Sequence, residues 1–193
     1  MESQRLVLAS ASPRRLDLLR QIGLEPDGVV PAEVDESPLK SELPRHTALR
    51  LATEKAAAVA AVQPDAYVLA ADTVVAVGRR ALPKAVSSQD VRDCLRLLSG
   101  RAHRVFTGLS VAAPSGRAAA RLIETRVRFK RLTEREIEAY LASGEGEGKA
   151  GGYAIQGRAA AFIPSLQGSY PAVVGLPVYE TVSLLKGLGF RFP

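Results

Sequence analysis

The sequence predicts an α/β fold in which helices flank a mixed, twisted sheet, and two observations support this class. Short apolar runs rich in β-favouring residues alternate with helical patterns toward both ends of the chain. Two further strand-like segments, joined by a turn, lie between them. No internal repeat, low-complexity tract or linker is found, so residues 1–193 are expected to form a single domain with room for two small lobes.

Composition is typical of a soluble globular protein, with 47% apolar and 24% charged residues. No run approaches the roughly 18 apolar residues that a membrane span needs, and the first residues lack the apolar core of a secretory signal. Cys94 is the only cysteine and is expected to be buried on a helix, so no internal disulfide is possible. This usage predicts a cytoplasmic protein.

The net charge of +6 suits nucleic acid and phosphorylated small molecules equally. The arginines are spread along the chain without the aromatic interleaving of a single-strand binder. No recognisable nucleic-acid module appears. The sequence therefore favours a small phosphorylated ligand over nucleic acid.

The first element is a short apolar strand at residues 6–8, followed by a loop and a helix that ends before Gly23. Ser12 is placed as the helix N-cap, and Pro13 takes the first helical position, where its missing N–H costs nothing.

Arg14 and Arg15 lie in the first turn of this helix, where the helix dipole is already positive. The hydroxyls of Ser10 and Ser12 and the free N–H groups of the helix lie beside them. This combination favours an anion site, most plausibly for phosphate. The alternative is a solvated basic turn after an ordinary capped helix.

A short strand near residues 29–30 leads into an exposed loop that carries Glu33, Asp35 and Glu36. These carboxylates either hold a divalent cation or form a solvated acidic loop. A helix is predicted at residues 44–62, and the residues alone predict that Lys55, near its middle, faces solvent.

The strongest strand signal is Ala66 to Gly78, which is nearly continuous in apolar residues, as a strand buried on both faces would be. Asp72 interrupts it, and an ionised carboxylate buried without a partner is very costly. We therefore expect Asp72 to lie at a strand end facing a cleft, to pair with a cation, or to cap a turn. Residues 78–85 then turn the chain and present Lys84.

Further along the chain, a capping box at Ser87 and Asp90 opens a helix that runs to residue 98. Strands are predicted at 103–113 and 117–130, joined as a hairpin. His103 is interpreted as a hydrogen-bonding loop residue in preference to a catalytic one. A second capping box, at Thr133 and Glu136, opens a helix that runs to residue 143.

The loop from Gly144 to Gly157 is too rich in glycine to form a regular element. It is either a flexible connector or a segment whose backbone approaches a ligand closely. After it we expect two last strands, at residues 159–163 and 173–174, and a final helix at 176–186.

Five segments, in order along nearly the whole chain, resemble the Maf family of nucleotide pyrophosphatases. They are ASASPRR, AADTVV, LSGRAHRVFTG, KAGGYAIQG and GSYPAVVGLP. The resemblance implies an α/β fold with a central cleft between two lobes, related to that of the inosine triphosphate pyrophosphatases. It also implies hydrolysis of a nucleoside triphosphate to the monophosphate and pyrophosphate with a divalent metal, and a homodimer. The KAGGYAIQG segment is similar to the dTTP/UTP branch, whereas another branch prefers 7-methyl-GTP.

The resemblance also implies roles for single residues. Asp72 corresponds to the family's proton acceptor. Arg14, Thr73 and Gln156 correspond to positions tied to substrate choice, so Thr73 and Gln156 are expected to read the pyrimidine edge by hydrogen bonds.

Three other polar positions of the family match Glu36, Lys55 and Lys84. The lysines, with the first-turn arginines, would neutralise the triphosphate, while Asp72 would activate the attacking water. Glu36 and Asp72 would hold the metal, for which Mg²⁺ is the default and Mn²⁺ or Co²⁺ are alternatives.

Two positions depart from the family pattern. Ala85 stands where a proline usually follows the second lysine, which would loosen the loop that holds Lys84. Gly148 stands where an aspartate usually precedes KAG, which removes a charge near the base pocket. Two rival functions stay open: a regulator of septum formation that binds a nucleotide or nucleic acid without cleaving it, and a pyrophosphatase for modified or purine nucleotides.

Overall fold

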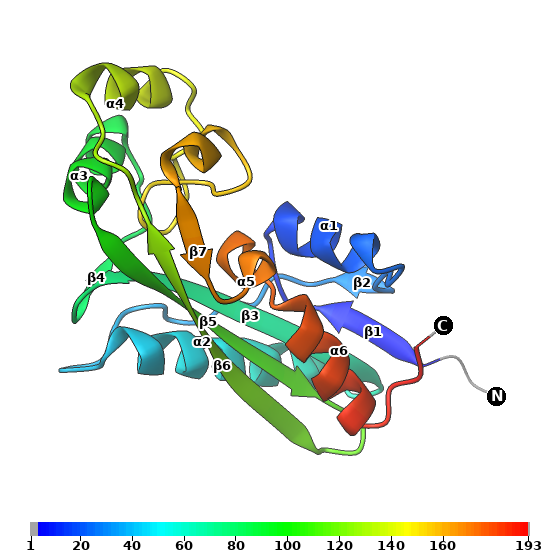
Figure 1. The fold of residues 1–193 in the computed structure, drawn as a ribbon. Helices are drawn as coiled ribbons and strands as arrows, with labels where there is room; N and C mark the ends of the chain where they lie inside the picture. The colour runs from blue at the N-terminus through cyan, green and yellow to red at the C-terminus, as the bar shows by residue number, and fades with distance from the viewer. Residues whose placement is uncertain (1–3, 193) are drawn as a thin grey trace.

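The computed structural model describes residues 4–192 as a seven-stranded mixed sheet flanked by helices (Figure 1), which confirms the predicted fold class. The strand order is β2-β1-β3-β5-β6-β7, and β4 pairs with β3 off this path. The strands are β1 (Arg5–Leu8), β2 (Gly28–Val29), β3 (Ala66–Val77), β4 (Arg80–Leu82), β5 (Ala102–Ala112), β6 (Ala118–Arg128) and β7 (Ser165–Gln167). The helices are α1 (Pro13–Gln21), α2 (Pro44–Val62), α3 (Ser88–Leu98), α4 (Glu134–Leu141), the 3₁₀ helix η1 (Arg158–Phe162), α5 (Tyr170–Val174) and α6 (Val178–Gly187).

Strand β3 is the centre of the sheet. It pairs parallel with β1 through Leu8↔Leu69 and antiparallel with β5 along most of its length. Its apolar sequence follows from this position, because both faces are covered by helices. The long helix α2 begins and ends at the residues expected from the sequence. Within residues 4–192, no helix combines the length and the apolar character needed to cross a membrane.

The two faces of the sheet carry different helices. Along β1, Leu6 and Leu8 point to one face, while Val7 points to the other. Helix α2 covers the face of Val7, where Ala56 and Val59 pack against it. Helices α1, α3, α4 and α6 cover the opposite face. The buried residues of α1 and α6 belong to the cluster that contains Leu8, and those of α3 and α4 belong to the cluster that contains Val105 of β5.

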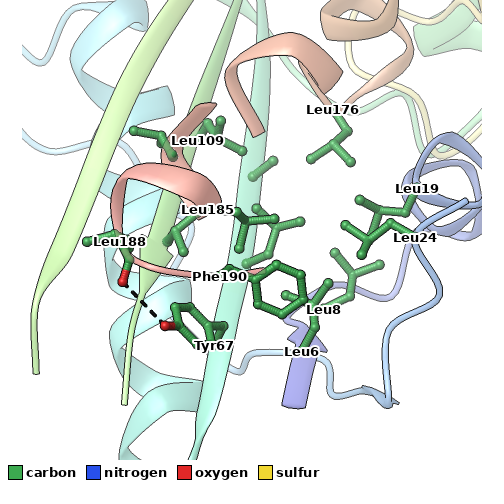
Figure 2. Packing of buried hydrophobic residues seen from close by; sticks show 14 of the residues in the cluster. Leu6, Leu8, Leu19, Leu24, Tyr67, Leu109, Leu176, Leu185, Leu188 and Phe190 are labelled. Carbon is green, nitrogen blue, oxygen red and sulfur yellow. Dashed lines mark hydrogen bonds between the residues drawn. The ribbon is translucent and has the colours of Figure 1, made fainter. Parts of the chain in front are cut away.

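The first of two large hydrophobic clusters joins the two ends of the chain. Figure 2 shows Leu6 and Leu8 of β1 packed with Leu185 of α6 and with Phe190, which follows α6. The ring of Tyr67 stands edge-on to Phe190 at 5.2 Å, and its hydroxyl donates to the carbonyl of Leu188 at 3.3 Å. This cluster therefore fixes α1 and α6 against the same stretch of β3.

The second large cluster lies at the other end of the same face, around α3 and α4. Both helices start with the capping boxes expected from the sequence, and Cys94 is buried on α3 as predicted. His103 also lies in this region. It is buried in β5 instead of in a loop, and its Nε2 lies 2.7 Å from the hydroxyl of Tyr153.

The two last strands predicted from the sequence are wrong. Residues 159–163 fall mainly in the 3₁₀ helix η1, and residues 173–174 end the short helix α5. The last strand is β7, which pairs with β6 through Leu166↔Val127. Short apolar runs such as AAAFI do not distinguish a strand from a buried helical turn, and packing against Phe129 and Tyr140 decides for the turn.

Candidate active site

The candidate site lies along an interruption in the edge of β3. Strand β1 ends at Leu8, opposite Leu69, and β4 joins the same edge of β3 only from Val75 onward. Between them, residues 70–74 pair with β5 alone. Asp72 and Thr73 occupy the middle of this gap and, as neighbours on a strand, point to opposite faces of the sheet. A ligand at the gap can therefore reach both side chains.

A cavity of about 390 Å³ occupies this gap. It is lined by seven parts of the chain: the end of β1 with the start of α1, the loop before α2, α2 itself, the centre of β3, the segment after β4, the glycine-rich loop, and the end of α5 with Gly175. All ten site residues predicted from the sequence line it: Ser10, Ser12, Arg14, Arg15, Glu36, Lys55, Asp72, Thr73, Lys84 and Gln156.

A chain of alternating charges crosses the cavity. The ammonium of Lys55 donates to Asp72 Oδ1 at 2.6 Å and to Glu36 Oε1 at 2.5 Å. The ammonium of Lys84 donates to Glu36 Oε2 at 3.0 Å. Burial acts to raise the pKa of Glu36, but the hydrogen bonds from both lysines outweigh it, so the pKa lies below its ordinary value. Glu36 is therefore an anion that links two cations.

Two expectations drawn from the residues alone need correction here. Lys55 does not face solvent: it is 7% exposed, because its position on α2 points toward the sheet. Asp72 is not at a strand end and caps no turn; it lies inside β3, also 7% exposed. The pairing of Asp72 with a cation, the other alternative, is confirmed by the contact with Lys55. An ion pair so deeply placed is retained at a cost in desolvation.

The start of α1 supplies a second set of cations. Arg15 donates from Nε to the carbonyl of Gly175 at 2.8 Å and from Nη1 to Ser10 Oγ at 3.0 Å. Ser12 occupies the N-cap position, but its hydroxyl makes no capping hydrogen bond. Arg14 is half-buried, and its guanidinium makes no hydrogen bond or ion pair within the described chain. Arg15 is therefore held by hydrogen bonds within the protein, whereas Arg14 has none among the described residues.

The two guanidiniums lie close enough to repel each other. Burial lowers the pKa of Arg15, Asp72 opposes that shift, and Arg14 adds to it. Burial also lowers the pKa of Arg14. Arginine stays protonated at neutral pH in spite of such shifts. The site therefore holds positive charge that an anion would stabilise.

The remaining predicted residues lie at the rim and on the far face of β3. Thr73 Oγ1 lies 3.5 Å from Thr107 Oγ1, and Thr107 in turn donates to the carbonyl of Ala172 in α5 at 2.8 Å. Gln156 is exposed on the cavity wall. Both side chains therefore keep hydrogen-bonding groups on the cavity surface.

The glycine-rich loop packs against the protein and is not a flexible connector, while part of it lines the cavity, so a close approach to a ligand stays a prediction. Gly151 has φ +69°, and an added Cβ would lie 2.8 Å from a methyl group of Val75. At Gly157 an added Cβ would lie 2.1 Å from Glu145 Oε2. Glycine is required at Gly151, because the backbone there has a positive φ and follows β3 too closely for a side chain, whereas the Glu145 side chain near Gly157 can rotate away.

The substitution at Ala85 does not release Lys84. Ala85 is fully buried; its N–H donates to the carbonyl of Lys149 at 3.1 Å, and its carbonyl accepts from the N–H of Gly148 at 2.7 Å. Lys84 itself forms a bridge with Ala150. The segment that carries Lys84 is thus held by backbone hydrogen bonds that a proline at position 85 would remove in part.

Two further cavity residues were not selected from the sequence. Lys149 is half-buried beside the cavity, and burial together with Arg14 lowers its pKa. Tyr153 lines the cavity, and its hydroxyl contacts His103. Both are chemically reactive residues of the glycine-rich loop, which is a signal visible in the sequence, but the path of the loop was needed to place them at the cavity.

The acidic loop contributes one carboxylate, not three. Only Glu36 reaches the cavity; Asp35 instead accepts from the N–H of Ser37 at 2.9 Å. No cluster of three or more histidine, cysteine or acidic side chains able to hold a metal occurs among residues 4–192. Glu36 and Asp72 nevertheless share a cation, the Lys55 ammonium, between their oxygens. Two carboxylates completed by water and phosphate oxygens are a donor set that suits Mg²⁺.

Comparison with known proteins identifies the family. The family model described as "Maf-like protein" matches residues 5–188. The dTTP/UTP pyrophosphatase of Caulobacter vibrioides is 65% identical over 186 residues, which cover 96% of each chain. The dTTP/UTP pyrophosphatase of Mesorhizobium japonicum is 59% identical over 97% of this chain and 93% of its own.

Among solved structures, a nucleoside-triphosphatase (dITP/XTP pyrophosphatase) of Mycobacterium abscessus shows a distant likeness. Its TM-score is 0.43 at 16% identity, over 67% of this chain and 74% of that one. This likeness is too weak to support a conclusion about activity. The match of the Maf-like model to nearly the whole sequence, together with relatives that are more than half identical, shows that the chain belongs to the Maf-like protein family.

Proposed function

We propose that this chain is a nucleoside triphosphate pyrophosphatase that hydrolyses dTTP and UTP to the monophosphate and pyrophosphate. Full-length relatives at 58–65% identity carry the name dTTP/UTP pyrophosphatase. The observation that carries the proposal is the cavity at the β3 gap, where the Asp72 carboxylate lies among cations from four parts of the chain. A site of this kind suits a reaction at the phosphate groups of a nucleotide.

The cations divide into two groups with different tasks. Lys55 and Lys84 are already paired with carboxylates, whereas Arg14 has no acidic partner within residues 4–192. Arg14 is therefore free to bind the substrate phosphates first, by a bidentate contact that lysine does not offer. Arg15, held by Ser10 and Gly175, contributes charge from a fixed position. Together these groups offset the repulsion between the triphosphate and an attacking water.

Asp72 is the residue that would orient that water and accept its proton. Its second oxygen, Oδ2, makes no hydrogen bond in the described chain, and Asp72 lines the cavity. Glu36 and Asp72 are the residues that would hold a divalent metal, which supplies charge neutralisation and lowers the pKa of bound water. Without substrate, the Lys55 ammonium holds the two carboxylates beside each other.

Base selection is assigned to Thr73 and Gln156. Both side chains carry hydrogen-bonding groups, and both residues line the cavity. A site that hydrogen-bonds the edge of the correct base leaves its own polar groups unpaired when the wrong base enters, which gives strong discrimination. This selection supports pyrimidine over purine nucleotides.

The experiment is a turnover panel on the purified protein. Pyrophosphate release is measured from dTTP, UTP, CTP, dATP, GTP and 7-methyl-GTP, without metal and with Mg²⁺, Mn²⁺ or Co²⁺. We expect metal-dependent release, fastest from dTTP and UTP. Preferred turnover of GTP or 7-methyl-GTP would favour the rival enzyme for purine or modified nucleotides. Nucleotide binding without release under any metal would favour the rival regulator of septum formation. The cytoplasmic location, the homodimer and the single domain stay predictions from the sequence.

A further inference from the structure

The loop that carries Glu36 has almost no packing of its own. Residues 35–41 are all exposed and form no helix or strand. No buried apolar side chain in this segment anchors it to the core. Its position therefore depends on polar contacts, and a loop held only in this way opens easily.

One arginine of α2 contacts the loop at Ser37 and also holds Glu42, the residue that follows the loop. Arg50 donates from Nε and Nη2 to the two oxygens of Glu42, at 2.7 and 2.8 Å. From Nη2 it also donates to the carbonyl of Ser37 at 3.1 Å. This bidentate pair is shielded from water, with Glu42 8% and Arg50 18% exposed at the side chain. It is stronger than an ordinary surface ion pair for that reason.

Glu42 extends the contact into the loop. Its Oε2 accepts from the N–H of Leu39 at 3.0 Å, and its own N–H donates to the Leu39 carbonyl at 3.0 Å. The contact with Arg50 keeps the pKa of Glu42 at about 2, well below the ordinary 4.5, so the carboxylate is ionised in any neutral assay. Arg50 thus fixes the loop directly at Ser37 and indirectly at Leu39.

We propose that Arg50, with Glu42, is a positioning residue that holds the loop where Glu36 reaches the two cavity lysines. Ser37 immediately follows Glu36, so the Arg50 contact with its carbonyl fixes the backbone from which the Glu36 side chain extends. Arg50 does not line the cavity, so it acts through Glu36. That Arg50 supports the reaction through Glu36 rests on the proposed function. That Arg50 holds the loop in place does not depend on it.

The chain offers a matched control on the same helix. Glu54 also pairs with Arg50, at 3.0 Å to Nη1, but it is one helical turn along α2 and holds no part of the loop. Arg50→Gln and Glu42→Gln remove the loop contacts, whereas Glu54→Gln removes only the helix-surface pair. Arg50→Lys keeps the charge but loses the planar fork that spans Glu42 and Ser37.

The first measurement is amide hydrogen exchange of residues 31–43, followed by mass spectrometry on the full-length protein without ligand. We expect exchange at least about tenfold faster in Arg50→Gln and Glu42→Gln than in the wild type, with Glu54→Gln unchanged. Arg50→Lys should lie between. Equal exchange in wild type and Arg50→Gln, with both proteins folded by circular dichroism, would overturn the proposal.

The second measurement is pyrophosphate release from dTTP as a function of Mg²⁺. Residues that support a metal ligand typically change metal affinity by about 10- to 100-fold when removed. We expect Arg50→Gln to raise the Mg²⁺ concentration needed for half-maximal rate by that factor, with kcat at saturating Mg²⁺ changed less than about threefold. A purely structural role would lower kcat without moving the Mg²⁺ dependence. If the wild type releases no pyrophosphate, the proposed function fails, and hydrogen exchange still decides the role of Arg50.

Discussion

Asp72 is the residue on which the proposed chemistry depends. An ionised carboxylate inside a buried strand is stable only beside a cation, and Lys55 lies 2.6 Å away. Asp72→Asn keeps a carbonyl oxygen for Lys55 but cannot accept a proton from water. We expect turnover of dTTP to fall by at least about 100-fold, the usual lower range for a lost general base. Pyrophosphate release measures this, and near-normal turnover would remove Asp72 from the mechanism.

The fold of this variant is the necessary control. Glu36 still contacts Lys55 when Asp72 is replaced, so the buried ammonium keeps one anionic partner. We therefore expect urea denaturation to show a loss of no more than about 1–2 kcal/mol, less than the cost of leaving a buried charge unpaired.

Replacing Lys84 is expected to affect substrate binding and not the turnover step, because Lys84 is exposed at the cavity rim. Its side chain is 60% exposed, and its one ion pair is with Glu36. Lys84→Ala should leave stability unchanged and raise KM for dTTP by roughly tenfold, the equivalent of one charge-assisted hydrogen bond. Steady-state kinetics test this. An unchanged KM would show that the segment around Ala85 does not present Lys84 to the substrate, in spite of its backbone hydrogen bonds.

At the scale of elements, α2 packs closely against β5 at Gly108. A Cβ added at Gly108 would lie 2.0 Å from the carbonyl oxygen of Ala48, a backbone atom that cannot rotate away. Gly108→Ala should destabilise the protein by about 3 kcal/mol or more, at the upper end of overpacking effects. Gly28→Ala, where the nearest atom would be 3.8 Å away, is the matched control and should change stability little. Equal denaturation midpoints for the two variants would contradict this packing.

This element also shows what the sequence could predict. The pattern of α2 predicted its bounds, because small apolar residues recur at helical spacing along it. The same pattern placed Lys55 in solvent, because periodicity within one helix does not report a carboxylate on a strand 17 residues later. The residues of η1 and α5 were predicted as strands for a similar reason: their conformation depends on partners distant in sequence.

The candidate site was likewise predictable from the sequence only in part. The first turn of α1 predicted an anion site through the type and order of its own residues. The family motifs selected most of the cavity-lining side chains. Neither source showed the gap in the edge of β3, since a gap is a property of where β1 stops and β4 starts. The position of Lys149 beside the cavity and the contact of Arg50 with the loop at Ser37 likewise depend on the three-dimensional path of the chain.

At the scale of the whole molecule, His103 makes stability depend on pH. Burial lowers its pKa from 6.5 to about 4, and its Nδ1 has no hydrogen-bond partner within the described residues. Between pH 6.5 and 4 the unfolded chain binds a proton at this site that the folded chain does not. The free energy of unfolding is therefore unaffected by this titration above pH 6.5. It decreases as the pH falls below 6.5, by about 3 kcal/mol at pH 4.

The measurement compares wild type with His103→Gln, in which glutamine retains a hydrogen-bonding group for Tyr153 but does not titrate. Urea denaturation at pH 7 and pH 4.5 should show a larger loss in the wild type, by about 2–3 kcal/mol. Parallel losses in the two proteins would show that His103 is not buried as a neutral ring. Other groups titrate equally in both, so the difference isolates this residue.

The hydrogen bond from Arg15 to Gly175 joins residues 160 positions apart. A nascent chain emerges from the ribosome N-terminus first, so Arg15 waits for most of translation before its acceptor exists. Until then its guanidinium has only one of its two hydrogen-bond acceptors, the hydroxyl of Ser10. A chain that stops before Gly175 would thus lack the acceptor that holds the Arg15 Nε, and the cavity wall beside α1 would stay incomplete.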